Sequence, residues 1–467
     1  MGAGRHAGGA PAAKVAVIGA GIGGLGAAWA LARNHDVVVY DAERRLGGHA
    51  NTVEIADGGR RIAVDTGFIV YNERNYPNLV RLFADLGVPT EPSDMSFSVS
   101  RRRGRFEYQA RALGLLTQPS NLTRPAYRRM VRDIVRFTRE APSAIGSGST
   151  ETIDGFLDRL GLSEDFRRDF LLPVVACIWS SSFETMRGYP AEAMVRFLDN
   201  HGLLNVLERP AWRTVTGGSR SYVSRIADAL GPDVRIGRPV LAVRRGPHGV
   251  TVHDAEGVER FDHVVLATHA DTSLALLGDD ATGAERDVLS AFRYGSNDVV
   301  LHRDDSFMPI RRRAWSSWNY LDERVDDGRD GEGVHDHDEE ERVSLTYWMN
   351  RLQNLRTERP VFVTVNPARE PRAIEGRFTY RHPQFDARSV EAQRRLPSLQ
   401  GRRRTWFAGA YHGSGFHEDG LRAGLAVAAG LRSPAPWWSP SEAQTVAPAA
   451  PAARPASTPV TIGAWSA

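Results

Sequence analysis

Cysteine and lysine are almost absent from this chain of 467 residues. A single cysteine, Cys177, excludes an internal disulfide framework, a cysteine-rich zinc site and an iron–sulfur cluster. The single lysine, Lys14, leaves essentially no lysine for Schiff-base or general-base chemistry. Long apolar runs are missing too, because none approaches the roughly 18 residues of a membrane-spanning helix. The Gly/Ala-rich residues 1–13 lack the apolar core of a signal peptide, so we expect a cytoplasmic protein.

Outside one segment, positive charge outweighs negative charge. Residues 322–342 hold eleven acids and three arginines, a local charge of −8, so the net charge of +3 leaves about +11 on the remainder, nearly all of it arginine. We expect 322–342 to be a mobile surface insertion. Its His335-Asp336-His337-Asp338 could hold a metal weakly, but a solvated loop is the favoured interpretation and no metal site is predicted. The length predicts two or three structural units, or one large α/β body with an inserted lobe.

The strongest motif is a glycine-rich turn between an apolar strand and a helix. Residues 14–19 read as a buried strand, and Gly19, Gly21 and Gly24 then open an Ala-rich helix. Gly19 suits a tight turn, Gly21 a close approach of backbone to a pyrophosphate, and Gly24 close packing of helix on strand. A second buried strand ends at Asp41, where a carboxylate can bind ribose hydroxyls. This unit predicts a dinucleotide site.

The rest of the chain alternates helical and strand patterns. Helical periodicity is expected at 75–90, 124–140 and 151–208, and strands at 234–265, 343–349, 361–365 and 405–410. A Gly-rich turn and a helix from about Asp419 follow the last strand. Residues 1–13 are expected to be disordered, and the Pro-, Ala- and Ser-rich residues 433–467 are expected to be a disordered tail.

A second glycine pair, Gly47-Gly48, follows Asp41 in DAERRLGG. Together with GAGIGGLGAA, this resembles the extended nucleotide-binding motif of the flavin-containing amine oxidase superfamily. VDTGF, the pair Gly217-Gly218 and the C-terminal FAGAYHGSGFHEDGLRAG match further segments of that superfamily in the same order, over about 14–430. The resemblance implies non-covalently bound FAD. The cofactor contacts it implies are Gly19, Gly21, Ile22, Gly24, Asp41, Ala42, Gly48, His49, Thr66, Gly67, Val240, Gly409, Glu418, Gly420 and Leu421.

The same resemblance implies an α/β fold, a Rossmann-like FAD-binding domain of the amine-oxidase type with an inserted α+β substrate-binding domain. The FAD-binding parts are expected at 14–90, 211–284 and 401–432, and the substrate-binding parts at 91–210 and 285–400.

Several segments, among them GGHANTV and GFHEDGLRAG, resemble one bacterial subgroup of predicted NAD/FAD-binding proteins. That subgroup is similar to the flavin domain fused ahead of plant cyclopropane-fatty-acid synthases. It implies an acyl-lipid or other hydrophobic substrate and an acyl-chain methyltransferase as a partner.

The chain departs from the superfamily near the expected flavin. The lysine that amine oxidases place near flavin N5 is absent, and His49 stands where many members have arginine, which leaves a histidyl link to the flavin conceivable. Tyr411 replaces an acid that often follows the last strand. With His412 and His417, it is a candidate catalytic residue; capping histidines in a Gly-rich turn are the alternative.

Four aromatic residues are candidates for the substrate pocket, with ordinary core packing as the alternative: Trp179, Trp318, Tyr347 and Trp348. Residues 124–140 combine an arginine face with an apolar face, and RRRGR at 101–105 adds positive charge. This pattern fits peripheral docking on an anionic membrane, or else a solvated face packed on the core. No nucleic-acid-binding module is recognisable.

The sequence therefore predicts a FAD-dependent oxidoreductase that dehydrogenates a modified or methyl-branched fatty-acyl chain by hydride transfer to flavin N5. The alternatives are a flavin amine oxidase or biosynthetic oxidase for a soluble small molecule, and a non-catalytic flavin subunit that assists an acyl-chain methyltransferase.

Overall fold

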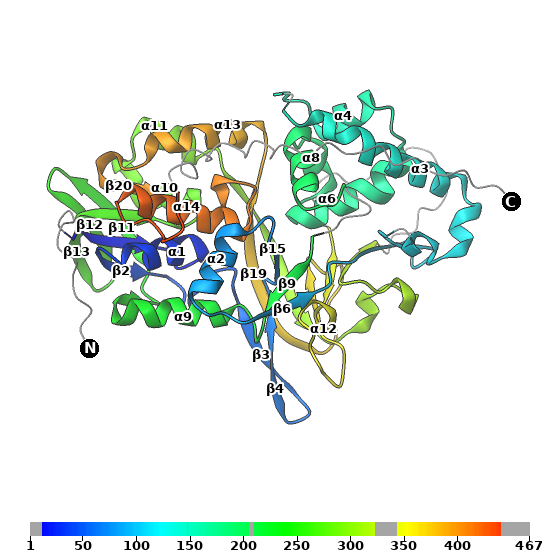
Figure 1. Cartoon of the computed structure of the whole chain (residues 1–467), viewed down its shortest axis with the longest axis horizontal. Helices are drawn as coiled ribbons and strands as arrows, with labels where there is room; N and C mark the ends of the chain where they lie inside the picture. The colour runs from blue at the N-terminus through cyan, green and yellow to red at the C-terminus, as the bar shows by residue number, and fades with distance from the viewer. Residues whose placement is uncertain (1–11, 112, 147, 205–209, 323–342, 440–467) are drawn as a thin grey trace.

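The computed structural model describes residues 12–439, except 112, 147, 205–209 and 323–342. The expected disordered ends, apart from 12–13 and 433–439, and the acidic insertion with its two histidines lie outside the described residues. Two lobes lie side by side along the longest axis (Figure 1). Among the described residues, no helix is both long and apolar enough to cross a bilayer.

The first lobe is built on a parallel sheet in the order β10 (Val234–Arg235), β2 (Asp36–Tyr40), β1 (Lys14–Ile18), β14 (His263–Leu266) and β20 (Thr405–Phe407). Alternate residues of a strand face opposite sides of its sheet. Val15 and Val17 accordingly pack with α1 (Ile22–Leu31), α2 (Pro77–Asp85), α9 (Arg220–Leu230) and α14 (His417–Gly430).

Ala16 and Ile18 face the other side of that sheet. They pack with a three-stranded antiparallel sheet of β11 (Val240–Gly246), β12 (Gly249–Asp254) and β13 (Gly257–Phe261). The same core includes α10 (Ala270–Leu277), α11 (Gly283–Leu289) and α13 (Ala387–Arg395). The last two fall in the span expected to form the substrate-binding domain, but their apolar faces pack in the nucleotide-binding lobe.

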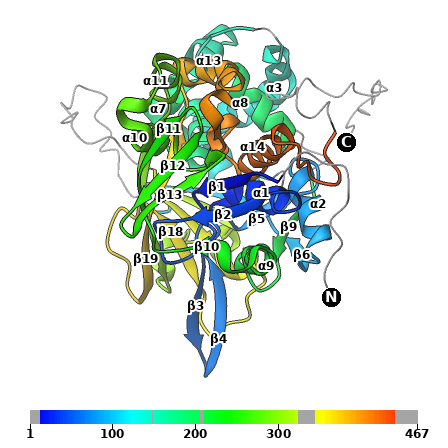
Figure 2. The same ribbon diagram turned by 90° about the vertical axis from the view of Figure 1, so that its left-hand side faces the viewer.

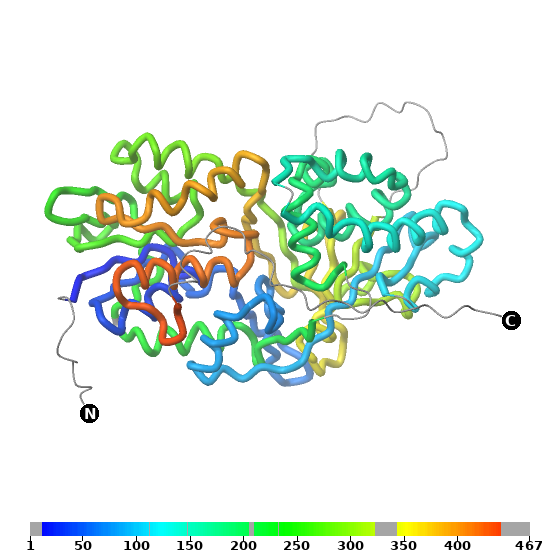
Figure 3. The backbone as a smooth tube through the Cα atoms, turned by 45° about the horizontal axis from the view of Figure 1, so that its top comes forward, coloured from blue at the N-terminus to red at the C-terminus, as the bar shows by residue number. Residues whose placement is uncertain are grey.

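The second lobe contains a seven-stranded sheet. Its strands, in spatial order, are β19 (Ile374–Gln384), β15 (Arg293–His302), β18 (Phe362–Val365), β17 (Leu345–Trp348), β16 (Trp318–Asp322), β7 (Phe97–Arg101) and β8 (Phe106–Gln109). A helical group covers one face near β7 and β16 and shares a core with them. Its helices are α3 (Pro125–Glu140), α4 (Ile153–Arg159), α5 (Glu164–Phe166), α6 (Leu172–Trp179), α7 (Phe183–Arg187) and α8 (Ala191–Asn200). The tube view separates this group from the nucleotide-binding lobe (Figure 3).

Short strands join the two lobes. The hairpin of β3 (Thr52–Asp57) and β4 (Arg60–Asp65) projects from the body (Figure 2), and its inner residues Ile55 and Val64 pack with β15, β18 and α12 (Met349–Leu352). The strands β5 (Val70–Asn72), β9 (Trp212–Val215) and β6 (Thr90–Ser93) form a small antiparallel sheet. The chain therefore crosses between the lobes in several places, and the crossings after α11 and before α13 lie within the span expected to form the substrate-binding domain. The carboxyl ends of the parallel strands face the junction.

Candidate functional site

The glycine-rich turn lies at the carboxyl edge of the parallel sheet, where open α/β sheets bind ligands. A Cβ atom at Gly19 would lie 2.7 Å from the Ala267 carbonyl oxygen, and one at Gly24 only 1.8 Å from the Gly19 carbonyl oxygen. Packing of the protein on itself therefore requires both glycines. It does not require Gly21, whose φ of −71° suits any residue and whose added Cβ would meet no atom within 4 Å.

Gly21 is instead explained by a ligand. It is the N-cap of α1, and the first turn of that helix has neither a side-chain cap nor an acidic residue. Its backbone N–H groups are therefore available to an anion. The second glycine pair lies against the same turn, since Gly47 N–H donates to the Ala20 carbonyl (2.9 Å) and a Cβ at Gly48 would lie 3.2 Å from Gly21 Cα. This cradle fits a pyrophosphate.

Asp41 ends β2 beside the glycine turn. Its carboxylate accepts hydrogen bonds from the backbone N–H of Ala20 (2.7 Å) and of Glu43 (2.8 Å). Arg238 N–H donates to the Asp41 carbonyl (2.9 Å), which brings the start of β11 at Val240 close to this acid. The exposed Ala42 follows. Asp41 is thus held at the edge of the cradle, where a ribose would follow the pyrophosphate.

The Asp65-Thr66-Gly67 segment is a buried junction between the lobes. Asp65 accepts hydrogen bonds from Ser219 N–H and Oγ, Thr52 Oγ1 and Gln353 Nε2. Burial raises the pKa of Asp65 to about 6, although these hydrogen bonds act in the opposite direction. A Cβ at Gly67 would lie 2.2 Å from the His49 carbonyl oxygen, so this glycine allows the segment to pass directly beside the second glycine pair.

Buried imidazoles gather at this junction. The His49 ring lies 5.1 Å from the Tyr380 ring and 5.2 Å from the His382 ring, and its buried Nε2 has no protein partner. Burial lowers the pKa of His49, with His382 as a further cause, and lowers the pKa of His382 and His269 to about 4. These side chains are therefore neutral at physiological pH and can donate or accept one hydrogen bond.

The orientation of His382 is set by a chain of amides. Asp298 N–H donates to Asn366 Oδ1 (3.0 Å), and Asn366 Nδ2 donates to Asn297 Oδ1 (2.8 Å). Asn297 Nδ2 then lies 3.1 Å from His382 Nδ1. Because an amide nitrogen only donates, Nδ1 must accept and the proton of neutral His382 lies on Nε2. The sequence patterns did not single out His269, His382, Tyr380 or Asn297. Of these, His269 alone carried a signal, since it lies three residues after the end of β14, in the turn at the carboxyl edge of the parallel sheet.

The start of α14 closes the junction. Glu418 was expected to contact the cofactor, but its carboxylate accepts hydrogen bonds from Asn78 N–H (3.0 Å), Asn78 Nδ2 (2.8 Å) and Leu79 N–H (3.0 Å). Its side chain therefore anchors α2, and burial raises its pKa to about 7. Gly420 and Leu421 pack against Ile22 and Gly26 of α1. Glu418 can therefore reach a ligand only through its backbone N–H.

The three candidate catalytic side chains do not form one group, because Tyr411 and His412 contact each other (4.7 Å between ring centroids) and His417 lies apart from them. His417 stacks on Phe68 (3.8 Å), and its Nε2 lies 2.8 Å from the Tyr222 hydroxyl, at the junction. Tyr411, which follows Gly409, packs against Phe292 in the core on the other side of the parallel sheet. His412 borders a cavity on the outer face of α14. Burial lowers the pKa of both histidines to about 3. Of the three, His417 alone joins the imidazole group.

The four candidate pocket aromatics likewise do not form one group. Trp318 and Tyr347 meet edge to face (5.0 Å), and both pack with Trp179 in the core beneath the helical group. Trp348 lies on the opposite face of β17, against Trp315 (5.3 Å), because neighbouring strand residues point to opposite faces. The indole nitrogens of Trp179 and Trp318 are buried without a partner.

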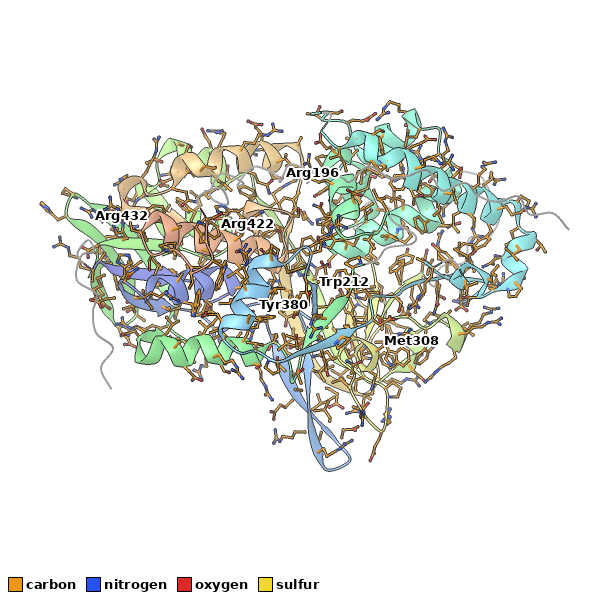
Figure 4. All side chains as sticks on the ribbon, in the orientation of Figure 1. Arg196, Trp212, Met308, Tyr380, Arg422 and Arg432 are labelled. Atoms are coloured by element: carbon orange, nitrogen blue, oxygen red, sulfur yellow. The ribbon has the colours of Figure 1, made fainter. Side chains whose placement is uncertain are left out.

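A row of aromatic rings connects this core to the junction. Trp179 contacts Phe197 (4.8 Å), and Phe197 stacks on Phe416 (4.8 Å), the residue directly before α14. The stick view places Trp212 and Tyr380 close to the boundary between the lobes (Figure 4). Neither Phe197 nor Phe416 was singled out in the sequence.

The residues present fit FAD. Gly21, the start of α1 and Gly48 would hold its pyrophosphate, Asp41 its ribose, and the junction of His49, Thr66 and α14 its ring system. Bound there, the flavin supplies the acceptor for two electrons and a proton. Within the described parts of the chain, no three His, Cys, Asp or Glu side chains are placed to hold a metal.

Comparisons with known proteins agree with this geometry. A search of curated proteins finds no match. Cyclohexylamine oxidase from Brevibacterium oxydans has a similar structure, with a TM-score of 0.67 at 19% identity over 90% of this chain and 99% of that one. A CLA-producing fatty acid isomerase from P. acnes has a TM-score of 0.61 at 15% identity, over 88% of this chain and 97% of that one. Putrescine oxidase bound to putrescine has a TM-score of 0.62 at 16% identity, over 90% of this chain and 99% of that one. The model of the flavin containing amine oxidoreductases matches residues 22–432, so the chain belongs to that family and is a FAD-dependent oxidoreductase.

Proposed function

We propose that this flavoprotein dehydrogenates a hydrophobic substrate, a modified or methyl-branched fatty-acyl chain. The observation that carries the proposal is the row of rings Trp179, Phe197 and Phe416, which leads from the apolar core of the helical group to the start of α14. A chain of methylene groups gains free energy on burial against such a surface, by about 0.8 kcal/mol per CH₂.

The hydrogen-bonding state of the buried carboxylates also favours an uncharged substrate over a cationic amine. Every buried Asp or Glu among the described residues already has a protein partner: Asp57, Asp65, Glu107, Asp133, Glu285, Asp304, Asp322 and Glu418. An amine would need a carboxylate that is not already engaged. The apolar core offers instead the free indole N–H groups of Trp179 and Trp318, which suit a carbonyl or carboxylate oxygen.

The chain's own residues would bind and align the substrate and exclude water. The neutral imidazoles of His49, His382 and His417 supply donors and acceptors without placing a positive charge beside an apolar C–H bond. Dehydrogenation removes a hydride from one carbon and a proton from its neighbour: the bound flavin would supply the hydride acceptor, and a neutral imidazole of this group would take the proton. The fatty acid isomerase among the structural neighbours shows that this fold admits acyl chains elsewhere.

We further propose that an anionic membrane presents the acyl chain. The apolar face of α3 is not available for this, because Tyr127, Met130 and Phe137 are buried in the core of the second lobe. The contact would instead be made by four exposed apolar residues at the end of this lobe: Leu113, Leu116, Leu122 and Ile310. Leu113 and Ile310 are 83% and 71% exposed.

Positive charge surrounds these apolar residues. The exposed Arg103 and Arg105 flank Gly104, at which an added Cβ would be 2.5 Å from Ile310 Cδ1. Arg124 and Arg128 lie at the start of α3. This combination is typical of surfaces that dock on acidic phospholipid. An acyl-chain methyltransferase acting on the same membrane is the partner we propose, because it would generate the methyl-branched chain.

The experiment is anaerobic reduction of the purified holoenzyme by a panel of extracted phospholipids and amines, followed by flavin absorbance. We expect bleaching by acyl lipid and none by amines. Phe416→Ala should slow bleaching at least about tenfold. Phe378 on β19 is also half-buried, and Phe378→Ala should leave the rate of bleaching unchanged. Bleaching by amines alone would establish the amine-oxidase alternative, and bleaching by neither would favour a non-catalytic subunit.

The membrane contact has its own test, flotation with vesicles that contain phosphatidylglycerol. Leu113→Asp should abolish flotation and leave flavin content unchanged, while Val135→Asp, on the exposed side of α3, should not abolish it. Equal flotation of Leu113→Asp and the wild type would refute this contact surface.

A further inference from the structure

A cavity of about 530 Å³ lies on the side of α14 that faces away from α1. Gly420 and Gly424 of α14 contact α1, whereas Arg422, Ala426 and Gly430, on the opposite side of the helix, line the cavity. Its volume is within the roughly 300–1,000 Å³ of small-molecule sites. It is separate from the flavin cradle, and no part of the proposed dehydrogenation uses it.

Three buried polar atoms at this cavity have no hydrogen-bond partner among the described residues. They are His412 Nε2, Trp406 Nε1 and Trp438 Nε1, on three residues that all line the cavity. The His412 side chain belongs to a residue that is only 8% exposed. Buried polar groups almost always find a partner, because leaving one unpaired costs free energy. Three such exceptions around one cavity indicate a ligand.

The Trp406 indole is held in place. A Cβ at Gly430 would lie 2.6 Å from its Cζ3 atom, and one at Gly401 would lie 3.0 Å from its Cζ2 atom. The two glycines therefore clamp the ring from α14 and from the turn before β20. The indole N–H has a fixed position and cannot turn to find a partner elsewhere.

The chemistry of the walls selects the ligand. Arg422 is the one charged residue among those lining the cavity. Arg422 donates to Asp419 (3.1 Å), but a guanidinium has five N–H groups, so donors remain. The Gln400 amide donates to the Phe407 carbonyl and accepts from the Phe407 N–H, which fixes its orientation and leaves one N–H free to donate. An indole N–H only donates, so the head group must accept hydrogen bonds and can carry negative charge.

The remaining walls suit an apolar body. Ala426 and Val427 of α14, together with Pro397 and Pro434, present aliphatic surface. We propose that the cavity is a binding site for a small amphipathic carboxylate, with the carboxylate taken by Arg422, His412 and the two indole N–H groups, and the alkyl chain lying along α14. The proposal does not depend on the identity of the oxidised substrate.

The test is calorimetric titration of the oxidised holoenzyme with decanoate, decanol and decylamine. Decanoate is expected to bind one to one and at least tenfold more tightly than decylamine. Ala426→Trp fills the cavity and should abolish decanoate binding, whereas Ala229→Trp, at an exposed position of α9, should retain it. Flavin absorbance and thermal unfolding establish that both variants are folded.

Two conservative Trp→Phe variants distinguish the contribution of an indole N–H donor from that of ring packing. Trp438→Phe keeps a ring but loses the N–H, and should weaken decanoate binding about tenfold. Trp437→Phe loses an N–H that donates to Asn78 outside the cavity, and should leave decanoate binding unchanged. Absence of saturable decanoate binding, tighter binding of decylamine, or decanoate binding that survives Ala426→Trp would each overturn the proposal. Flavin bleaching is measured separately, so failure of this site and failure of the acyl-dehydrogenase proposal are distinguishable.

Discussion

The carboxylate of Glu418, in the first turn of α14, accepts hydrogen bonds from both the backbone N–H and the side-chain amide of Asn78, in the first turn of α2. Two helices more than 300 residues apart in sequence thus start against each other. The contact fixes the start of α14, beside which the ring system of FAD would lie.

Stability should depend on pH through this contact. Burial raises the pKa of Glu418 from 4.5 to about 7, so the cost of its ionisation is absent below pH 4.5 and complete above about pH 7. Glu418→Gln removes the ionisation. Relative to this variant, the wild type should lose up to ~3 kcal/mol of unfolding free energy as the pH rises from 5 to 8. Urea unfolding of the apoproteins measures the difference, and a gap that does not change with pH would contradict the prediction.

The two glycines at the start of α1 should respond differently to alanine. Gly21→Ala meets no protein atom and should leave the stability of the apoprotein equal or slightly higher, but weaken FAD binding at least tenfold. Gly24→Ala forces a Cβ against the Gly19 carbonyl and should cost more than about 2 kcal/mol. Unfolding of the apoproteins and fluorescence titration with FAD measure the two effects. Unchanged FAD affinity in Gly21→Ala would show that the cradle is wrongly placed.

Asp65 is expected to hold the lobes together. Asp65→Asn replaces one acceptor oxygen by a donor that would face the N–H groups of Ser219 and Gln353, so unfolding free energy should fall by about 3 kcal/mol. Asp85→Asn, on the exposed end of α2, serves as the control and should change it by less than about 0.5 kcal/mol. Denaturant unfolding measures both, and equal effects would refute the special role of Asp65.

A buried ion pair stabilises the nucleotide-binding lobe. The Arg245 side chain is 1% exposed and pairs with Glu285 and with Asp280 (2.9 Å). Arg245→Met leaves Glu285 charged and buried, so it should cost about 3–5 kcal/mol, and adding Glu285→Met should restore part of the loss. The neighbouring exposed Arg244→Met should be nearly neutral. A double variant less stable than Arg245→Met alone would contradict this interpretation.

The sequence by itself determined the nucleotide-binding unit. Gly19, Gly21, Gly24 and Asp41 are close in sequence, and a strand, a turn and a helix of this length can adopt only a few arrangements. Local chemistry therefore predicted the parallel sheet and a dinucleotide cradle. The resemblance to the amine oxidase superfamily implied FAD, and the family match confirms that cofactor. The near absence of lysine can likewise be read directly from the sequence.

Only the tertiary structure decided which side chains meet at the site. His49, His382 and His417 come from three distant segments, and nothing in their local sequence reveals that these segments converge. One residue of register separates Tyr347 from Trp348 and sends them to opposite faces of a sheet. Glu418 and His412 stand in the expected motif, yet helix packing turns the first toward α2 and places the second at a cavity on the outer face of α14. Packing between segments that are distant in sequence sets the directions of these side chains, and a local sequence pattern does not reveal that packing.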